Sequence, residues 1–130
     1  MKSDALGSKL RQWTDDEVPS KTLRDKLKEI ALTNEKRANE VYSFFDDYAD
    51  CLKAMYDVLK WNGYCCIVIG DRTASGIPIP NGTITSETCE SVGFSMIERV
   101  ERRMYMRALR SNIICSESVL IMKKGEYGSR

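Results

Sequence analysis

The feature that most constrains the fold is a run of six apolar residues, Tyr64 to Ile69, enclosed by turn signals. Asn62-Gly63 precedes the run and Gly70-Asp71 follows it. The run is rich in β-branched residues and carries no charge, which predicts a strand buried on both faces of a sheet. The rest of the fold must therefore supply such a strand with neighbours and with cover.

A long helix is predicted immediately before this strand. Between about Asn34 and Lys60 the apolar residues recur at helical spacing and form one stripe. Asn62-Gly63 is suited to end the helix, because both residues tolerate the left-handed backbone conformation. A helix, an Asn-Gly turn and a buried strand form the second half of a βαβ crossover. The sequence therefore predicts an α/β fold with parallel strands.

Shorter elements are predicted on both sides of this unit. Leu23, Leu27 and Ile30 mark an amphipathic helix, and Ser20 is placed to be its N-cap. Residues 73–82 contain two glycines and two prolines and end in an Asn-Gly pair. This composition predicts a loop closed by a turn.

Another helix and two more strands are predicted toward the end of the chain. The helix begins at about Thr83 or Thr85 and ends at Val92, before a glycine. From Phe94 apolar and polar residues alternate, which is typical of a half-exposed strand. A last strand is expected at 119–122, closing at Lys123-Lys124, and residues 125–130 are interpreted as a tail.

Composition limits the class of protein. The 130 residues suffice for one domain, and the net charge is +1. No apolar run approaches the ~18 residues that cross a bilayer, and the N-terminus lacks the apolar core of a signal peptide. These features predict a cytoplasmic protein without membrane contact. The five cysteines include adjacent Cys65-Cys66, interpreted as small buried side chains in a reducing compartment rather than as a disulfide framework.

The chain contains no histidine. This excludes histidine general bases, histidine-containing catalytic triads and histidine-ligated metals, and no metal site is predicted. Any chemistry must use carboxylates, hydroxyls, backbone groups or a partner.

Asp71 and Arg72 follow the apolar strand, at the end of a strand where open α/β sheets bind ligands. Gly70 would let a ligand approach the backbone. Asp71 accepts hydrogen bonds from a ligand in one interpretation and caps a helix or turn in the other. Its position alone does not separate the two.

Residues 99–110 hold five arginines and one glutamate in a chain that is neutral overall. In one interpretation Arg99, Arg102 and Arg103 follow a phosphate backbone. In the other they form a solvated edge strand whose charges prevent aggregation. Both interpretations fit the sequence.

Several motifs together carry a family resemblance. They are the helix and turn Tyr48 to Tyr64, the strand end Ile67 to Arg72 with the loop Gly76 to Ile79, the turn Ser91 to Phe94 and the last strand Ser116 to Lys124. Their order resembles the later half of the catalytic domain of amino-group DNA methyltransferases. These are the N4-cytosine and N6-adenine enzymes of restriction–modification systems. The resemblance spans roughly residues 5–124.

The resemblance implies a partial Rossmann-like (class I) methyltransferase sheet of mixed parallel and antiparallel strands over residues 1–124. It implies that the complete enzyme methylates DNA at cytosine N4 or adenine N6, with cytosine N4 favoured and S-adenosylmethionine as the methyl donor. It also implies substrate-binding roles. Asp71 and Arg72 would line the site, Glu117 would be near the pocket or structural, and the phosphate contacts would be Arg99, Arg102 and Arg103.

Two motifs of that family are absent. The catalytic tetrapeptide Ser/Asp/Asn-Pro-Pro-aromatic does not occur, and neither does the aromatic-x-Gly-x-Gly turn that binds the cofactor. No catalytic residue is therefore assigned, and the chain is interpreted as a fragment or subunit that is inactive in isolation. In enzymes of permuted order the missing motifs lie before and after the segment represented here.

The 64–69 strand also predicts association. The later strands can pair with one of its edges, but the sequence offers no partner for the other edge. An open apolar edge is an association site, so we expect a complementary methyltransferase polypeptide or a second copy there. The sequence also fits two functions other than DNA methylation. One is a non-catalytic remnant or interaction protein of the same fold, and the other is a methyltransferase half acting on RNA or protein.

Overall fold

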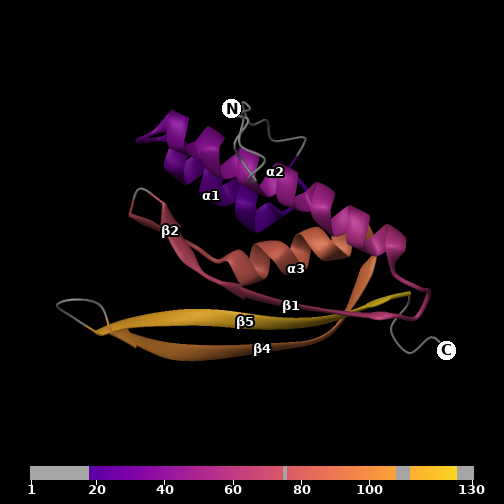
Figure 1. The fold of residues 1–130 in the computed structure, drawn as a ribbon. Coiled ribbons are helices and arrows are strands. Elements are labelled where there is room, and N and C mark those ends of the chain that lie inside the picture. The colour runs from indigo at the N-terminus through magenta and orange to yellow at the C-terminus, as the bar shows by residue number, and fades with distance from the viewer. Residues whose placement is uncertain (1–17, 75, 108–111, 126–130) are drawn as a thin grey trace, which may run out of the picture.

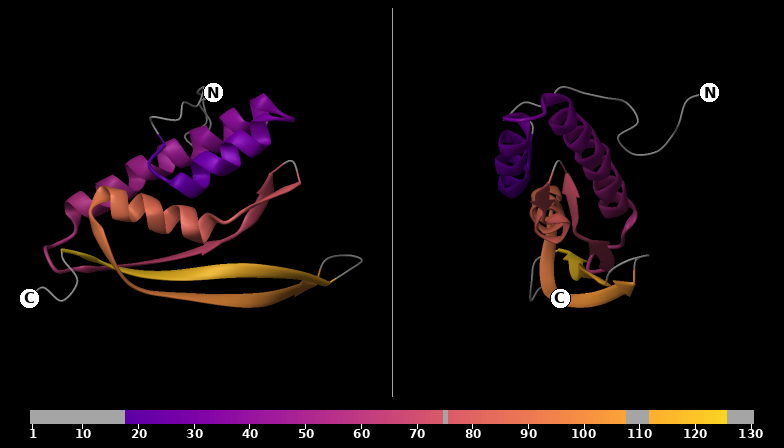
Figure 2. Two further views of the ribbon diagram at one scale, coloured as in Figure 1. Left: turned by 180° about the vertical axis from the view of Figure 1, so that it is seen from behind. Right: turned by 90° about the vertical axis from the view of Figure 1, so that its left-hand side faces the viewer.

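The computed structural model describes residues 18–74, 76–107 and 112–125. The elements in chain order are α1 (Lys21–Ala31), α2 (Glu35–Val58), β1 (Tyr64–Gly70), β2 (Arg72–Ala74), β3 (Ile77–Ile79), α3 (Asn81–Val92), β4 (Phe94–Arg107) and β5 (Asn112–Lys124). These helices lie on one side of the sheet, with α3 between the sheet and the α1–α2 pair (Figures 1 and 2). The predicted α/β class is confirmed. What the sequence predicts for residues 1–17 and for the tail after Gly125 falls outside the described residues.

The sheet has the strand order β1-β5-β4, and both of its pairings are antiparallel. Leu120 of β5 lies opposite Ile67 on one side and opposite Arg99 on the other. Strands β1 and β4 therefore run in the same direction, with β5 reversed between them. The parallel neighbour that the sequence predicts for β1 is not found among the described residues, where every pairing is antiparallel.

A polar N-cap starts each of the two N-terminal helices, and the predicted cap Ser20 is confirmed. The Ser20 hydroxyl accepts a hydrogen bond from the Leu23 amide at 3.1 Å, which starts α1. The side chain of Asn34 accepts one from the Arg37 amide at 3.0 Å, which starts α2. The predicted long helix agrees with α2 to within two residues at each end.

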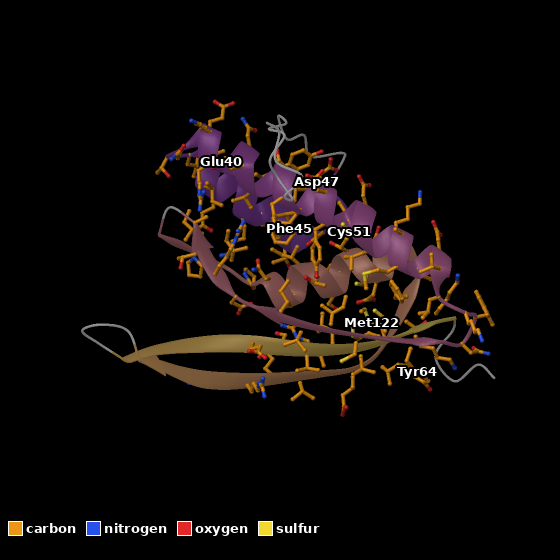
Figure 3. The ribbon with its side chains drawn as sticks, in the orientation of Figure 1. Glu40, Phe45, Asp47, Cys51, Tyr64 and Met122 are labelled. Carbon is orange, nitrogen blue, oxygen red and sulfur yellow. The ribbon has the colours of Figure 1, made fainter. Side chains whose placement is uncertain are left out.

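The core has two parts that meet at α2. One part packs between α1, α2 and the start of α3 and includes Leu27, Phe45 and Ile84. The other packs between α2, α3 and the sheet and includes Leu52 and Met122. Figure 3 shows Phe45 among the helices and Met122 between α3 and the sheet. Because the helices cover only one face of the sheet, the other face contributes nothing to either cluster.

The prediction that the 64–69 strand is buried on both faces is wrong. Burial alternates along β1, and Tyr64, Cys66 and Val68 are exposed on the face that no described helix covers. Tyr64 is 64% exposed and Val68 57%. The predicted burial of the adjacent cysteines fails for the same reason, because Cys66 is exposed while Cys65 is half-buried.

The loop predicted at residues 73–82 is also corrected. Strands β2 and β3 form a short antiparallel hairpin around Gly76, whose φ of +77° favours glycine. Asn81-Gly82 does not form a turn but begins α3, two to four residues before the predicted start. The close approach of α3 to β5 requires a glycine at this position, because a Cβ on Gly82 would lie 2.7 Å from the Ser118 Cβ.

Candidate functional site at the carboxyl end of β1

Three segments meet where β1 ends. The Asp71 amide donates a hydrogen bond to the Ser116 carbonyl of β5 at 3.0 Å. The Asn81 side-chain Nδ2 donates to the Gly70 carbonyl at 2.9 Å, which ties the start of α3 to the end of β1. These bonds fix the corner that carries most of the predicted site residues.

Asp71 lies at the N-terminal end of α3. Its Oδ1 accepts a long hydrogen bond of 3.4 Å from the Gly82 amide, where a negative charge is favoured by the helix dipole. A guanidinium nitrogen of Arg99 lies 3.3 Å from the position that a Gly82 Cβ would take. Asp71 and Arg99 thus approach the same helix start, and the helix-cap interpretation of Asp71 has structural support.

Arg72 points elsewhere. Its guanidinium carbon lies 4.9 Å from the centroid of the Phe44 ring on α2, a cation–π contact. Burial, and then the neighbouring charge of Arg37, lower the pKa of Arg72, but an arginine remains charged at neutral pH. Arg72 therefore joins the hairpin to α2 and is not grouped with Asp71.

The three predicted phosphate-binding arginines lie on opposite faces of β4. Arg99 is opposite the buried Leu120 and so shares its face, while Arg102 is opposite Glu117 on the other face. Arg103 is exposed and follows the period of Arg99. The strand thus presents these charges in two directions and not as one patch.

Two of these arginines are already paired with carboxylates. Arg99 Nη2 lies 2.6 Å from Glu101 Oε1, and Arg102 Nη2 lies 2.7 Å from Glu117 Oε1. Glu117 lies opposite Gly70 on β1 as well, so its pair with Arg102 joins β4 to β5 near the corner. A phosphate contact through Arg102 requires that it replace or share this ion pair.

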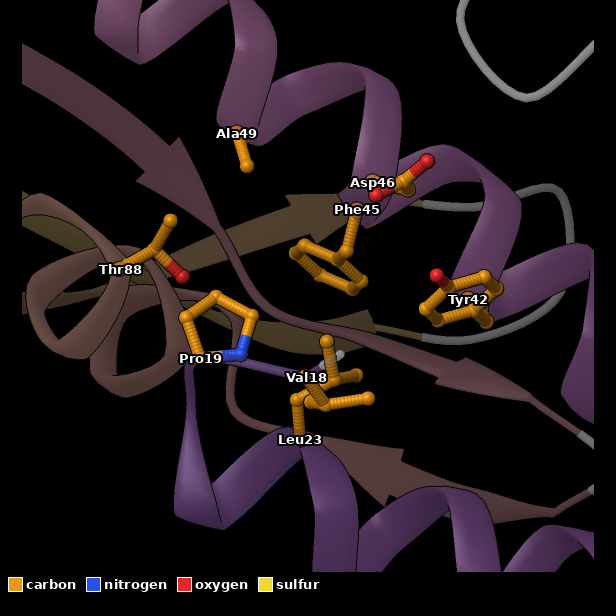
Figure 4. A pocket seen from close by; sticks show the side chains of 8 residues that line it. All are labelled: Val18, Pro19, Leu23, Tyr42, Phe45, Asp46, Ala49 and Thr88. Carbon is orange, nitrogen blue, oxygen red and sulfur yellow. The ribbon is translucent and has the colours of Figure 1, made fainter. Parts of the chain in front are cut away.

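Two hollows lined by described residues lie away from this corner. The first, of about 10 Å³, lies between Pro19, Phe45 and Thr88 and has room for about one water molecule (Figure 4). The second, of about 280 Å³, lies between α2 and α3, where Asp50 and Lys53 contribute to its lining. None of the predicted site residues lines either hollow.

Two polar side chains join distant elements without any signal in the sequence. Glu87 of α3 accepts hydrogen bonds from the hydroxyls of Ser20 and Thr22, both at 2.6 Å. Burial raises the pKa of Glu87, but these bonds and the nearby Lys21 outweigh it and hold the pKa below its ordinary value. Lys124 Nζ donates to the last carbonyls of α2, at 2.7 Å and 3.0 Å.

Within residues 18–74, 76–107 and 112–125, histidine, cysteine, aspartate and glutamate side chains do not gather in a group that could hold a metal ion. In the same ranges no helix combines the length and the apolar character needed to cross a membrane. No protein-family model, curated protein or solved structure matches the chain. The proposals below therefore depend on the residues and their geometry.

Proposed function

We propose that the chain is the later half of the catalytic domain of an amino-group DNA methyltransferase of restriction–modification type, present as a fragment or a subunit. In the complete cytoplasmic enzyme S-adenosylmethionine would donate a methyl group to DNA, to cytosine N4 in preference to adenine N6. The sheet topology is the observation that carries this proposal.

The strand order supports the proposal in two ways. The resemblance implies a sheet of mixed parallel and antiparallel strands, and here β1 and β4 run in the same direction with β5 antiparallel between them. A helix precedes the first of these strands and another connects the first to the second, as α2 and α3 do here. On this proposal a parallel, Rossmann-like neighbour belongs on the free side of β1.

The described residues do not fit the cofactor. The hollows are between helices and not at a strand end, and the Asp71 carboxylate is engaged by the first turn of α3. We therefore assign the S-adenosylmethionine site and the catalytic motif to the missing part of the enzyme. What this chain contributes is the sheet that supports them and the corner at the end of β1.

The positions of the predicted substrate-binding residues decide which of them remain candidates for contact with DNA. Asp71 and Glu117 border the corner at the end of β1, whereas the side chain of Arg72 contacts Phe44 of α2. Arg103 is exposed and has no ion pair among those described for β4, so it is the arginine best placed to contact a phosphate.

The experiment is reconstitution with the product of a flanking reading frame that carries the Pro-Pro-aromatic and Gly-x-Gly motifs. The two chains are expected to co-purify and to transfer a tritiated methyl group from S-adenosylmethionine to DNA, while this chain alone transfers none. Co-purification without methyl transfer to DNA would contradict the proposal, as would the absence of such a reading frame.

A salt series on the assembled complex tests the phosphate contacts. If Arg103 touches a phosphate, Arg103→Gln should reduce the slope of log affinity against log salt by about one. Arg99→Gln, which removes a charge already paired with Glu101, is the matched control and should change the slope less. Equal slopes for all three proteins would leave these arginines as protection of the β4 edge.

A second candidate is a non-catalytic interaction protein of the same fold. It is favoured by the uncharged edge of β1, which no strand among the described residues pairs with and which suits association whether or not chemistry follows. This candidate predicts a stable complex whose partner lacks the methyltransferase motifs. Methyl transfer by that complex would exclude it.

A further inference from the structure

The two outer strands of the sheet differ in how they are protected. Strand β4 carries Glu98, Arg99, Glu101 and Arg102 and has a bulge between Met96 and Glu98. Charges and bulges are common devices that keep an edge strand from pairing with another chain. Strand β1, from Tyr64 to Gly70, has no charge, no proline and a regular register along its whole length. The fold therefore protects one edge and leaves the other ready to pair.

Hydrogen bonds at the ends of β1 show which of its backbone groups are free. The Lys124 amide donates to the Gly63 carbonyl, and the Asp71 amide donates to the Ser116 carbonyl. Since the backbone groups of alternate residues point to opposite sides of a strand, the odd-numbered residues face β5. The even-numbered residues face the open edge.

The free stretch has a defined centre. The Gly70 carbonyl already accepts a hydrogen bond from Asn81, so among the described residues the stretch in which both amide and carbonyl face the open edge without a hydrogen-bond partner consists of Tyr64, Cys66 and Val68. Strands β2 and β3 turn from the end of β1 toward the helices (Figure 1) and form a separate two-stranded sheet, so neither pairs with this side of β1. Cys66 is the middle residue of the three.

We propose that in the isolated chain β1 pairs antiparallel with β1 of a second copy, about a two-fold axis at Cys66. Cys66 then lies opposite Cys66 of the other copy, and Tyr64 lies opposite Val68. A two-fold axis requires a surface that complements itself, and a short uncharged strand meets this requirement in the antiparallel direction. The pairing would form about six backbone hydrogen bonds and join two three-stranded sheets into one.

The exposed side chains fit the same register. Tyr64 is 64% and Val68 57% exposed, and both are on the outer face of β1. The pairing places each beside the other across the axis, where an aromatic and a β-branched side chain attract one another. The inference concerns the chain by itself and is independent of the methyltransferase proposal, in which a complementary polypeptide would compete for the same edge.

The test measures the molar mass of the chain in solution and of two single-residue variants. Light scattering at about 100 µM should give twice the 14.8 kDa of the chain. Val68→Pro removes an amide that faces the open edge and no bond to β5, so it should weaken the dimer at least ~100-fold while circular dichroism stays unchanged. Val100→Lys, on the exposed outer face of β4, is the control and should leave the dimer within about threefold of its original affinity.

A second measurement does not depend on that variant. A short bis-maleimide should join the two copies through Cys66, because paired residues of antiparallel strands lie about 5.5 Å apart between Cα atoms. Mass spectrometry of the digested dimer identifies the linked cysteine. A monomer at 100 µM, a dimer that Val68→Pro leaves intact while folded, or a crosslink through another cysteine would each overturn the proposal.

Discussion

Substitution of Gly82 tests how the candidate corner is built. A Cβ at this position would lie 2.7 Å from the Ser118 Cβ and in closer contact still with its hydroxyl. The two Cβ atoms are each bonded directly to a backbone Cα, that of Gly82 in α3 and that of Ser118 in β5. Side-chain rotation cannot separate them, so α3 must move away from the sheet to accept an alanine. Overpacking of this kind costs about 1–3 kcal/mol, and alanine recovers at most about 1 kcal/mol in a helix.

The expected net loss for Gly82→Ala is therefore about 1–2 kcal/mol, or a melting temperature lower by roughly 3–10 °C. Urea unfolding followed by circular dichroism measures it. Gly70→Ala is the matched control: the nearest atom to its Cβ is 3.8 Å away, so its effect should be within about 0.5 kcal/mol.

A double-mutant cycle identifies the cause of the loss. In a Ser118→Gly background both clashing atoms are gone, so adding Gly82→Ala should be neutral or slightly stabilising, and the coupling should equal the overpacking cost of about 1–3 kcal/mol. If Gly82→Ala is as harmless as Gly70→Ala, or equally costly with and without Ser118, the description of this corner is wrong.

Three further predictions concern single side chains. Glu87→Gln should flatten the acid side of the curve of unfolding free energy against pH. A carboxyl whose pKa is lowered by folding adds stability above its ordinary pKa of 4.5, and this stability is lost as the pH falls through the lower pKa of the folded state. Urea titrations at several pH values measure the difference. Equal acid sensitivity of variant and wild type would contradict this. Lys124→Met should cost about 1–2 kcal/mol in the same assay, since two carbonyls at the end of α2 lose a charged donor; a loss under ~0.3 kcal/mol would deny it that role. Burial raises the pKa of the Cys89 thiol to about 12, so iodoacetamide at pH 8 should modify Cys51 and Cys66 well before Cys89, and mass spectrometry showing the reverse order would refute this burial pattern.

The sequence predicts the helices of this fold because their signals are local. Ser20 and Asn34 each accept a hydrogen bond within three residues, and the apolar stripe of α2 needs only the period of a helix. The predicted start of α3 is wrong for the opposite reason. Gly82 has turn chemistry in the sequence, but its role is to let a helix approach Ser118, thirty-six residues away.

The burial of β1 could not be read from its residues. An uninterrupted apolar run indicates cover on both faces, whereas the described helices cover one face only. The outer face and the free edge depend on what packs there, which the run itself does not encode. The ion pair of Arg102 with Glu117 could not be predicted from the sequence either, because it depends on the register of β4 on β5.

The central claim is that β1 is an unprotected edge of an incomplete sheet, and residue-resolved amide exchange tests it most directly. In dilute solution the amides of Cys65, Ile67 and Ile69 should exchange slowly, and those of Cys66 and Val68 fast. As the concentration rises, or when a complementary chain is added, Cys66 and Val68 should become slow too. Slow exchange at Cys66 and Val68 in a dilute monomer, or fast exchange there under every condition, would contradict the account.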